Sequence, residues 1–152
     1  MAKLTEHRAR KEYKCYKCER KIQKGEMYKK IVELYRKPKT VCNDCNVPRS
    51  ELTSSQYLGW IYDLQDNFVI NSKDDVESLI EIIEEQKEEL EERFENIPEQ
   101  LQDGNAGTIL QDRIEILEDT ISQLEQIDFD DTDEELKNKL EEAREILMYL
   151  GD

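Results

Sequence analysis

The sequence comprises 152 residues, of which 37% are hydrophobic and 39% are charged, against a usual charged share of about 25%. The mean hydropathy of −0.87 agrees with this polar composition. Such a chain can build a narrow core but not the thick core that shelters most active sites, so we expect that it is not an enzyme. No apolar run of about 18 residues is present, so neither a transmembrane helix nor a membrane partner is predicted.

The formal net charge of −15 is an average over two opposed segments. Residues 1–49 contain 15 Lys and Arg against 6 Asp and Glu, a net charge of +9. Residues 50–152 contain 7 basic and 31 acidic residues, a net charge of −24. A split of this size predicts two modules with different partners. The alternative is that the acidic half is only a solvated helical surface.

The N-terminal segment, residues 1–10, is charged and lacks the apolar stretch of a secretory signal. We therefore expect a cytoplasmic protein. The whole chain has only five Gly and three Pro, which argues against an all-β sandwich, because its many turns need these residues.

The four cysteines form two Cys-x-x-Cys pairs, Cys15–Cys18 and Cys42–Cys45, separated by 23 residues. A two-residue spacer lets one turn aim two thiolates at a point about 2.3 Å away, and two such turns complete a tetrahedral zinc site. Sulfur ligands at this geometry favour Zn²⁺, with iron as the main competitor. Four sulfurs leave no open position for water, so we predict one structural zinc ion. His7, the one histidine, is expected on the surface.

Two other interpretations of the cysteine pairs are weaker. A disulfide framework needs an oxidising compartment, which the N-terminal segment does not indicate. A thioredoxin-like redox pair needs a surrounding βαβ pattern, and neither pair has one.

The residues between the pairs have the pattern of a β-hairpin. A turn signal at 24–26 precedes a stretch rich in β-branched and aromatic residues at 27–35, and a second turn at 36–39 precedes a strand at 40–42. Two cysteine turns flanking a hairpin, followed by a helix, are typical of a zinc-ribbon or treble-clef-like finger, and both subtypes stay open. A module this small is expected to fold only with its metal.

Basic residues crowd the finger, and four tyrosines are interleaved with them. Lys and Arg can neutralise phosphates and tyrosines can stack on bases, so nucleic-acid binding by residues 1–49 is a candidate function. The candidate contact residues are Lys29, Lys30, Arg36 and Lys37. The alternative is that the tyrosines cover the cysteine turns and the lysines keep the module soluble.

Apolar residues recur at helical spacing through the rest of the chain. A helix is predicted over 50–66, followed by a break at 67–71. Three apolar seams then follow, at Val76–Leu101, Leu110–Ile127 and Leu136–Leu150. Because short turns separate the seams, they predict an antiparallel helical bundle or a coiled-coil hairpin.

Local signals mark the ends of these helices. Ser72 with Asp75 is a plausible N-cap, and Pro98 should end or kink the first long helix. A turn is predicted at residues 103–107. Thr132-Asp-Glu-Glu135 has the pattern of a capping box that begins the last helix.

Acidic residues crowd the outer faces of the predicted helices. Like charges at i,i+4 destabilise a helix by a few tenths of a kcal/mol each, which favours a functional reason for the excess. Solubility, mimicry of nucleic-acid phosphates and docking on a basic protein are the alternatives. The candidate partner-binding residues are Glu84, Glu85, Glu88, Glu91, Glu92 and Glu95.

A resemblance adds to these patterns. The segment Cys15-Tyr-Lys-Cys18-Glu-Arg-Lys-Ile-Gln-Lys-Gly-Glu-Met-Tyr28, with Val41-Cys-Asn-Asp-Cys45, resembles small zinc-ribbon modules of phage and mobile-element proteins. Residues 96–102, followed by Gly107, Leu110 and Arg113, resemble a short acidic helical module of similar phage proteins. The resemblance implies a phage accessory protein in the host cytoplasm, without a mechanism. The glycine usual after a second turn cysteine is missing, since Glu19 and Asn46 stand there.

Taken together, the patterns predict an α+β protein that is mostly α. Residues 1–49 form a basic four-cysteine zinc finger, residues 50–71 a helix and connector, and residues 72–152 an acidic helical bundle. The favoured function is that of a zinc-stabilised accessory protein which binds a basic protein through its acidic helices. The alternative is a nucleic-acid-binding finger whose helices recruit or assemble partners. A homo-oligomer through the helices is a further possibility.

Overall fold

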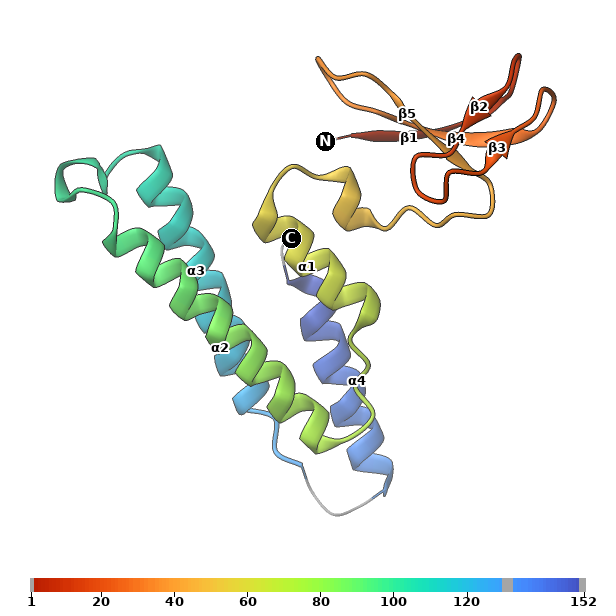
Figure 1. Cartoon of the computed structure of the whole chain (residues 1–152). Coiled ribbons are helices and arrows are strands. Elements are labelled where there is room, and N and C mark those ends of the chain that lie inside the picture. Colours follow the sequence, from red (N-terminus) through yellow and green to blue (C-terminus); the bar gives the residue numbers. More distant parts are fainter. Residues whose placement is uncertain (1, 130–132, 151–152) are drawn as a thin grey trace. The chain divides into compact units, whose positions relative to one another are not determined.

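The computed structural model describes residues 2–129 and 133–150, which form an α+β fold rich in helix. The strands are β1 (Lys3–Arg8), β2 (Tyr13–Lys14), β3 (Lys21–Ile22), β4 (Met27–Val32) and β5 (Lys39–Cys42). The α-helices are α1 (Gln56–Asn67), α2 (Lys73–Glu95), α3 (Asn105–Glu125) and α4 (Asp133–Tyr149). The chain divides into two compact units, Met1–Asp66 and Asn67–Asp152, each with its own internal packing (Figure 1).

A three-stranded antiparallel sheet in the order β1-β4-β5 and a short β2-β3 ladder form the strands of the first unit (Figure 1). β1 pairs with β4 along its whole length, from Lys3 opposite Val32 to Arg8 opposite Met27. β1 was not predicted from the sequence, because its residues do not alternate regularly between apolar and polar. Every residue of β1 is at least partly exposed. Its place in the sheet depends on main-chain hydrogen bonds to β4 rather than on burial of its side chains.

The hairpin predicted between the cysteine pairs is present as β4 and β5. β4 begins at Met27, as predicted, but ends at Val32, three residues earlier than the predicted limit of Tyr35. Gly25 lies in the turn before β4 with a φ of 92°, a conformation that residues with a side chain rarely adopt. The turn signal at residues 24–26 was therefore correct.

The hydrophobic core of the first unit is small and includes two of the cysteines. Ile22, Ile31 and Val41 are at most 4% exposed. Cys15 and Cys42 belong to the same buried cluster. A ligand bound by the sulfur atoms of these cysteines would therefore also be part of the packing of this unit.

The helix predicted over residues 50–66 begins later than expected. Residues Arg49–Leu52 form one turn of 3₁₀ helix, and α1 begins only at Gln56. Arg49 donates a hydrogen bond to Asp66, with 2.6 Å between Nη2 and Oδ1, and so connects the 3₁₀ turn to the end of α1.

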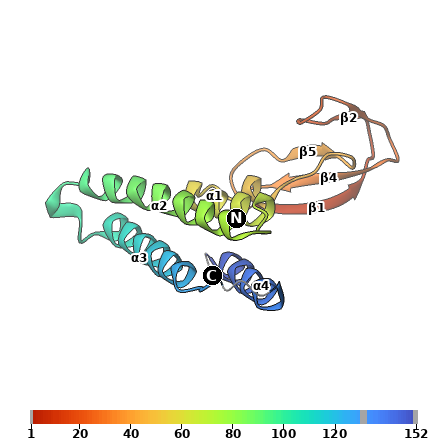
Figure 2. The same ribbon diagram turned by 90° about the horizontal axis from the view of Figure 1, so that it is seen from below.

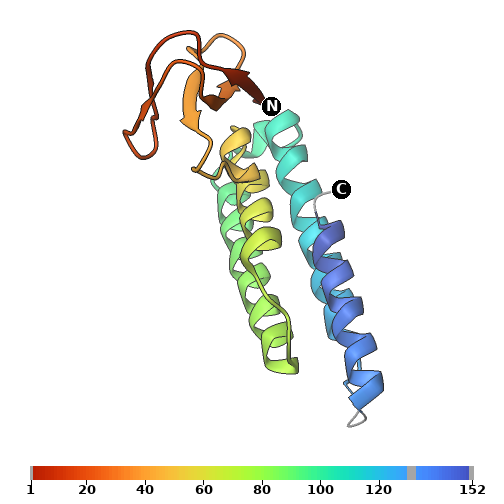
Figure 3. The same ribbon diagram turned by 90° about the vertical axis from the view of Figure 1, so that its right-hand side faces the viewer.

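In the described part of the second unit the α-helices are α2, α3 and α4. α2 and α3 run antiparallel, side by side along their lengths, and α4 returns along α3 (Figures 2 and 3). Seven of the predicted seam residues of α2 and α3 are buried: Val76, Leu79, Ile83, Leu90, Leu117, Ile121 and Leu124. Gly107 and Thr120 of α3 are also buried, although they were not assigned to a seam, and the predicted seam residues Leu110 and Ile114 are only partly buried. On α4, Leu140, Ala143 and Leu147 are buried in the same way. Arg144 of α4 donates two hydrogen bonds, of 2.9 and 2.6 Å, to the carbonyl oxygen of Ile70.

The predicted limits of α2 are confirmed. The Ser72 hydroxyl accepts a hydrogen bond from the Asp75 N–H at 3.3 Å, and the Asp75 carboxylate accepts one from the Ser72 N–H at 3.1 Å. The backbone N–H of Asn71 also bonds this carboxylate and is the main cause that lowers the pKa of Asp75. α2 ends at Glu95, three residues before Pro98.

Two predictions for the region between α2 and α3 are wrong. Leu101 was assigned to the apolar seam but is 62% exposed, because it lies in the 3₁₀ turn Glu99–Leu101 outside α2. The turn predicted at 103–107 ends early, since α3 begins at Asn105. The capping box predicted at Thr132–Glu135 begins outside the described residues.

Gly107 explains how α3 begins so soon after α2. A Cβ atom added at this buried position would lie 1.8 Å from the carbonyl oxygen of Gln102. Only a residue without a side chain therefore permits the chain to pass this close to the first turn of α3.

We predict that Gly107→Ala lowers the free energy of unfolding of the helical unit by about 2 kcal/mol or more, because backbone must shift to admit the methyl group. Urea denaturation measures this change, with the helical signal monitored by circular dichroism at about 222 nm.

Gly59→Ala on α1 is the matched control. The nearest atom to a Cβ added at Gly59 lies 3.7 Å away, which is ordinary contact. This substitution should be neutral or stabilising by up to about 1 kcal/mol, because Ala is the better helix former. Equal stability of the Gly107→Ala variant and the parent chain would contradict the role assigned to Gly107.

Candidate metal centre

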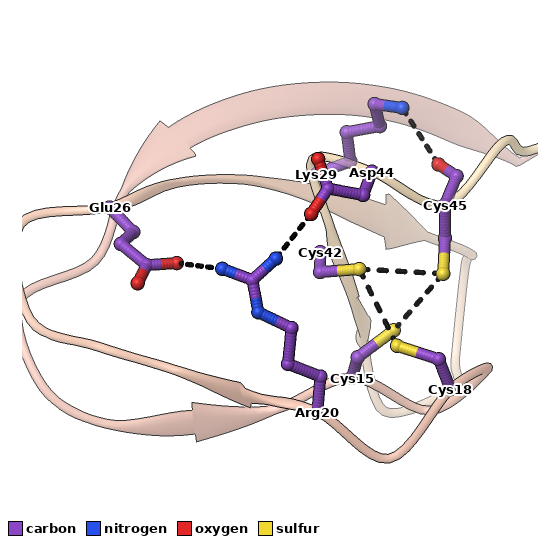
Figure 4. Close-up of polar contacts among 8 residues, drawn as sticks. All are labelled: Cys15, Cys18, Arg20, Glu26, Lys29, Cys42, Asp44 and Cys45. Atoms are coloured by element: carbon purple, nitrogen blue, oxygen red, sulfur yellow. Dashed lines mark hydrogen bonds and ion pairs between the residues drawn. The ribbon is translucent and has the colours of Figure 1, made fainter.

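The four cysteines come from two turn segments of the first unit and meet at one point (Figure 4). Cys15 directly follows β2, and Cys18 lies in the turn between β2 and β3. Cys42 is the last residue of β5, and Cys45 lies in the turn that follows it. The four Sγ atoms all lie within 4.8 Å of one another. The predicted convergence of the two Cys-x-x-Cys pairs is therefore confirmed.

The sulfur–sulfur distances fit a single metal ion. The Sγ atoms are 3.9 Å apart for Cys15 and Cys45, 3.6 Å for Cys18 and Cys42, and 3.4 Å for Cys42 and Cys45. A tetrahedron with metal–sulfur bonds of about 2.3 Å has edges of about 3.8 Å. All four cysteines are free of disulfides. The site could therefore hold one four-coordinate metal ion.

The opposite pKa shifts of two of the thiols show why a cation suits this site. Burial acts to raise the pKa of the Cys15 thiol, but the backbone N–H groups of Cys18, Cys42 and Lys17 outweigh it and lower the pKa to about 6. Hydrogen bonds to Cys42 and then Cys18 raise the pKa of the Cys45 thiol to about 12. Because like charges this close oppose one another, four thiolates can coexist only with a neutralising cation.

Lysine side chains fasten the second cysteine turn to the rest of the unit. Lys29 of β4 donates a 2.8 Å hydrogen bond to the carbonyl oxygen of Cys45 (Figure 4). Lys17 donates a bond of the same length to the carbonyl oxygen of Asn46 and pairs with Glu51 at 2.5 Å. The hydroxyl of Tyr16 donates to the other oxygen of Glu51 at 2.6 Å. These contacts connect the first turn, the second turn and the 3₁₀ turn.

Arg20 connects the two cysteine turns from the other side. Its guanidinium pairs with Asp44, which lies between the second pair of cysteines, and with Glu26 at 3.0 Å (Figure 4). Coulombic attraction to Glu26 and then to Asp44 raises the pKa of Arg20. Both ion pairs are largely exposed, so each is worth little in free energy, and their role is to orient the turns.

Glu19 occupies the position at which the first cysteine turn usually has glycine. Its φ is 62°, in the left-handed region. Its N–H donates a 3.0 Å hydrogen bond to the carbonyl oxygen of Cys15, which closes the turn. The turn therefore keeps the backbone conformation of a glycine-containing cysteine turn at the cost of strain in a residue with a side chain.

The predicted nucleic-acid contact residues lie on β4 and in the loop that follows it. Lys29 is engaged by the carbonyl oxygen of Cys45. Lys30 is its neighbour on β4, and consecutive strand residues point to opposite faces. Arg36 and Lys37 lie in the loop between β4 and β5, where Arg36 pairs with Glu33 at 3.4 Å. Sequence reasoning did not anticipate that Lys29 and Lys17 would bond main-chain carbonyls of the second turn.

The predicted acidic residues all lie on α2. Five of them, Glu84, Glu85, Glu88, Glu92 and Glu95, are exposed. Glu91 differs, since it is partly buried and its carboxylate lies 3.7 Å from Lys87, which also pairs with Glu118 of α3 at 3.1 Å. Glu91 therefore belongs to the contact between the two helices.

Comparison with known proteins leaves the site to be interpreted from its own geometry. No family model matches the chain, and no curated protein or solved structure matches it either. None of the helices in the described part of the chain is both long and apolar enough to span a membrane. The resemblance to phage zinc-ribbon modules stays a prediction from the sequence.

We predict that Glu19→Gly stabilises the metal-bound finger by about 1 kcal/mol, because glycine adopts the left-handed conformation without strain. Loss of the Lys14–Glu19 ion pair should matter little, since both side chains are more than 60% exposed (66% and 78%). Thermal unfolding of the metal-loaded protein measures the change, with unfolding monitored as the release of the metal to a chromogenic chelator.

Asn46→Gly provides the control at the equivalent position of the second turn. Asn46 does not have a positive φ, so glycine there adds only conformational freedom to the unfolded chain and should destabilise the finger slightly. If both glycine variants shift the unfolding temperature in the same direction, strain at Glu19 is not the cause.

Proposed function

We propose that the chain is a zinc-stabilised binding protein, not an enzyme, whose finger is held together by one structural zinc ion and whose helix α2 docks on a basic protein. The observation that carries the proposal is the meeting of Cys15, Cys18, Cys42 and Cys45 within 4.8 Å. Zinc is favoured over iron because a tetrahedral set of thiolates needs no redox chemistry to serve a structural role.

A structural role for the zinc ion is supported by where its ligands lie. Cys15 and Cys42 are 0% and 2% exposed and pack in the core cluster of the first unit. Four protein ligands fill the tetrahedron, so no position remains for a catalytic water. In so small a unit, the free energy of metal binding contributes directly to the free energy of folding.

The acidic docking surface follows the outer face of α2. We define the acidic stripe as Glu81, Glu84, Glu85, Glu88, Glu92 and Glu95, all of which are exposed. Within the described residues, none of these six side chains makes an ion pair. The bases of α2 pair elsewhere: Lys73 with Glu77, Lys87 with Glu91 and Glu118, and Arg93 with Glu89.

The acidic stripe stores unfavourable charge repulsion. Glu84 and Glu88, and again Glu88 and Glu92, are i,i+4 neighbours of like charge, and each such pair destabilises a helix by a few tenths of a kcal/mol. A basic surface that covers the stripe would relieve this repulsion and would be attracted from a distance at low ionic strength. A basic protein is therefore the partner that the charge pattern of α2 fits best.

Removing the metal should unfold the finger and leave the long helices intact. We predict that native mass spectrometry shows one zinc ion per chain. A Cys42→Ser variant should lose the zinc ion, and the ordered signals of the first unit should disappear from its two-dimensional NMR spectrum. The helical signal of α2, α3 and α4 should persist, because their buried seams include no cysteine.

A Cys42→Ser variant that keeps a full complement of zinc would contradict this assignment. So would four freely titratable thiols in the native protein. If the purified protein contained iron instead of zinc, the identity of the metal would be wrong but its structural role would stand.

The acidic stripe is tested by neutralising three of its members. We predict that Glu84→Gln, Glu88→Gln and Glu92→Gln together abolish capture of basic proteins from the cell in which the chain is expressed naturally, and raise the stability of the helical unit by up to about 1 kcal/mol. Affinity capture with the tagged full chain, quantified by mass spectrometry, measures the first effect.

The control removes the same charge from α4. Glu135, Glu142 and Glu145 are exposed, so their conversion to Gln changes the net charge equally without touching the acidic stripe. The partner should be retained by this control. Retention of the same proteins by the α2 variant would show that the stripe is only a solvated surface.

A further inference from the structure

The tip of the β4–β5 hairpin has an unusual backbone. The Arg36 N–H donates to the carbonyl oxygen of Glu33 at 3.4 Å, so Glu33–Arg36 form a turn with Leu34 and Tyr35 at its centre. Tyr35 has a φ of 63°, at the third position of the turn, where turns with a positive φ usually have glycine or asparagine. A large aromatic residue is strained in this conformation.

Among the described residues, no contact of the Tyr35 side chain compensates for this strain. Tyr35 is 98% exposed and Leu34 is 81% exposed. Among the described residues, the Tyr35 ring takes part in no hydrogen bond, ring contact or cation–π contact. Two apolar side chains are therefore held out in solvent at the end of a hairpin whose turn would form more readily with glycine.

The other tyrosines of the finger have structural partners. Tyr13 and Tyr28 pack ring to ring, with centroids 5.0 Å apart. Tyr16 bonds Glu51 and lies beneath the ammonium group of Lys39, which is 5.3 Å from its ring centroid. These three tyrosines are therefore engaged by other residues of the finger, in contrast to Tyr35.

Positive charge gathers near the same tip. Residues 29–39 contain five Lys and Arg and a single acidic residue, and two of the five, Lys29 and Lys39, are engaged by the carbonyl oxygen of Cys45 and by the ring of Tyr16. Within the described residues, Lys30 and Lys37 make no ion pair, and the Arg36 side chain is 72% exposed beside Glu33. In contrast, Lys17 and Arg20 near the cysteines are engaged by carboxylates. The tip thus combines an exposed aromatic ring with flanking cations, which suits an anionic ligand with flat faces.

We propose that the tip, residues 32–37, binds single-stranded nucleic acid, with the Tyr35 ring stacked on a base and with Arg36 and Lys37 contacting the flanking phosphates. Stacking on aromatic residues in a basic setting is how single strands are bound without sequence preference. A duplex keeps its base faces covered and should bind more weakly. The proposal does not depend on the acidic stripe and requires only a folded finger.

The test uses the full zinc-loaded chain and a fluorescently labelled oligo-dT of about 15 nucleotides. Fluorescence anisotropy at about 50 mM salt, where contacts between phosphates and Lys or Arg are stronger than at physiological salt, gives the dissociation constant. We expect measurable binding that weakens as salt rises and that is at least about tenfold weaker for the duplex of the same length.

Tyr35→Gly separates stacking from folding. Because glycine relieves the positive φ, this variant should unfold at the same or a higher temperature than the parent chain while binding oligo-dT about tenfold more weakly. Tyr35→Trp should keep the affinity. Lys37→Gln should reduce the slope of log affinity against log salt by about 1. Tyr149→Ala, which removes a 71% exposed tyrosine from α4, is the matched control and should change nothing.

Three results would overturn the proposal. The first is no binding of oligo-dT by the parent chain at low salt, and the second is equal affinity of the Tyr35→Gly variant. The third is equally tight, Tyr35-dependent binding of a poly-glutamate peptide or of a second copy of the chain, which would make the occupant an acidic protein surface. If the acidic stripe captured no basic protein, these three measurements on the hairpin tip would be unaffected.

Discussion

The meeting of four sulfur atoms at one point is the constraint on which the first unit depends. The two cysteine turns are far apart in the sequence, and two of their sulfurs lie inside a core that has few other large apolar residues. Strands β2 and β3 are only two residues long, so main-chain pairing alone does not hold the first turn in place. The side chains of Lys17, Lys29 and Arg20 orient the turns, but a cation is needed to bring four thiolates within 4.8 Å.

Charge is used differently in the two units. In the first, several cations are paired locally with carboxylates, as Arg20 is with Glu26 and Lys17 with Glu51, so the positive charge is not spread evenly over its surface. In the second, the acidic stripe of α2 has no ion pairs among the described residues. A net charge summed over a segment therefore did not show where an unbalanced surface lies. Pairing within the fold decides that, and it leaves the hairpin tip and the acidic stripe as the exposed extremes.

Features set by local spacing could be predicted from the sequence. The Cys-x-x-Cys spacing, the capping of α2 by Ser72 and the seams of α2 and α3 each depend on residues close together in the chain. Features set by contacts between distant segments could not. β1 pairs through its backbone with β4, and Lys29 bonds the carbonyl oxygen of Cys45. Leu101 was misplaced because the apolar spacing continues past the point at which Pro98 ends the helix.

The two residues with a side chain and a positive φ, Glu19 and Tyr35, show how strain can be interpreted. At Glu19 the unusual conformation has an internal purpose, because the N–H of Glu19 closes the turn onto the carbonyl oxygen of Cys15. The metal site then over-determines that conformation, which is the usual condition for strain to persist. At Tyr35 the turn is closed instead by the Arg36 N–H, which donates to the carbonyl oxygen of Glu33. Among the described residues the Tyr35 side chain makes no ring contact, and it lies 98% exposed. Glycine would satisfy the backbone equally well at this position, so the exposed and strained Tyr35 supports the proposal that this residue contacts a ligand.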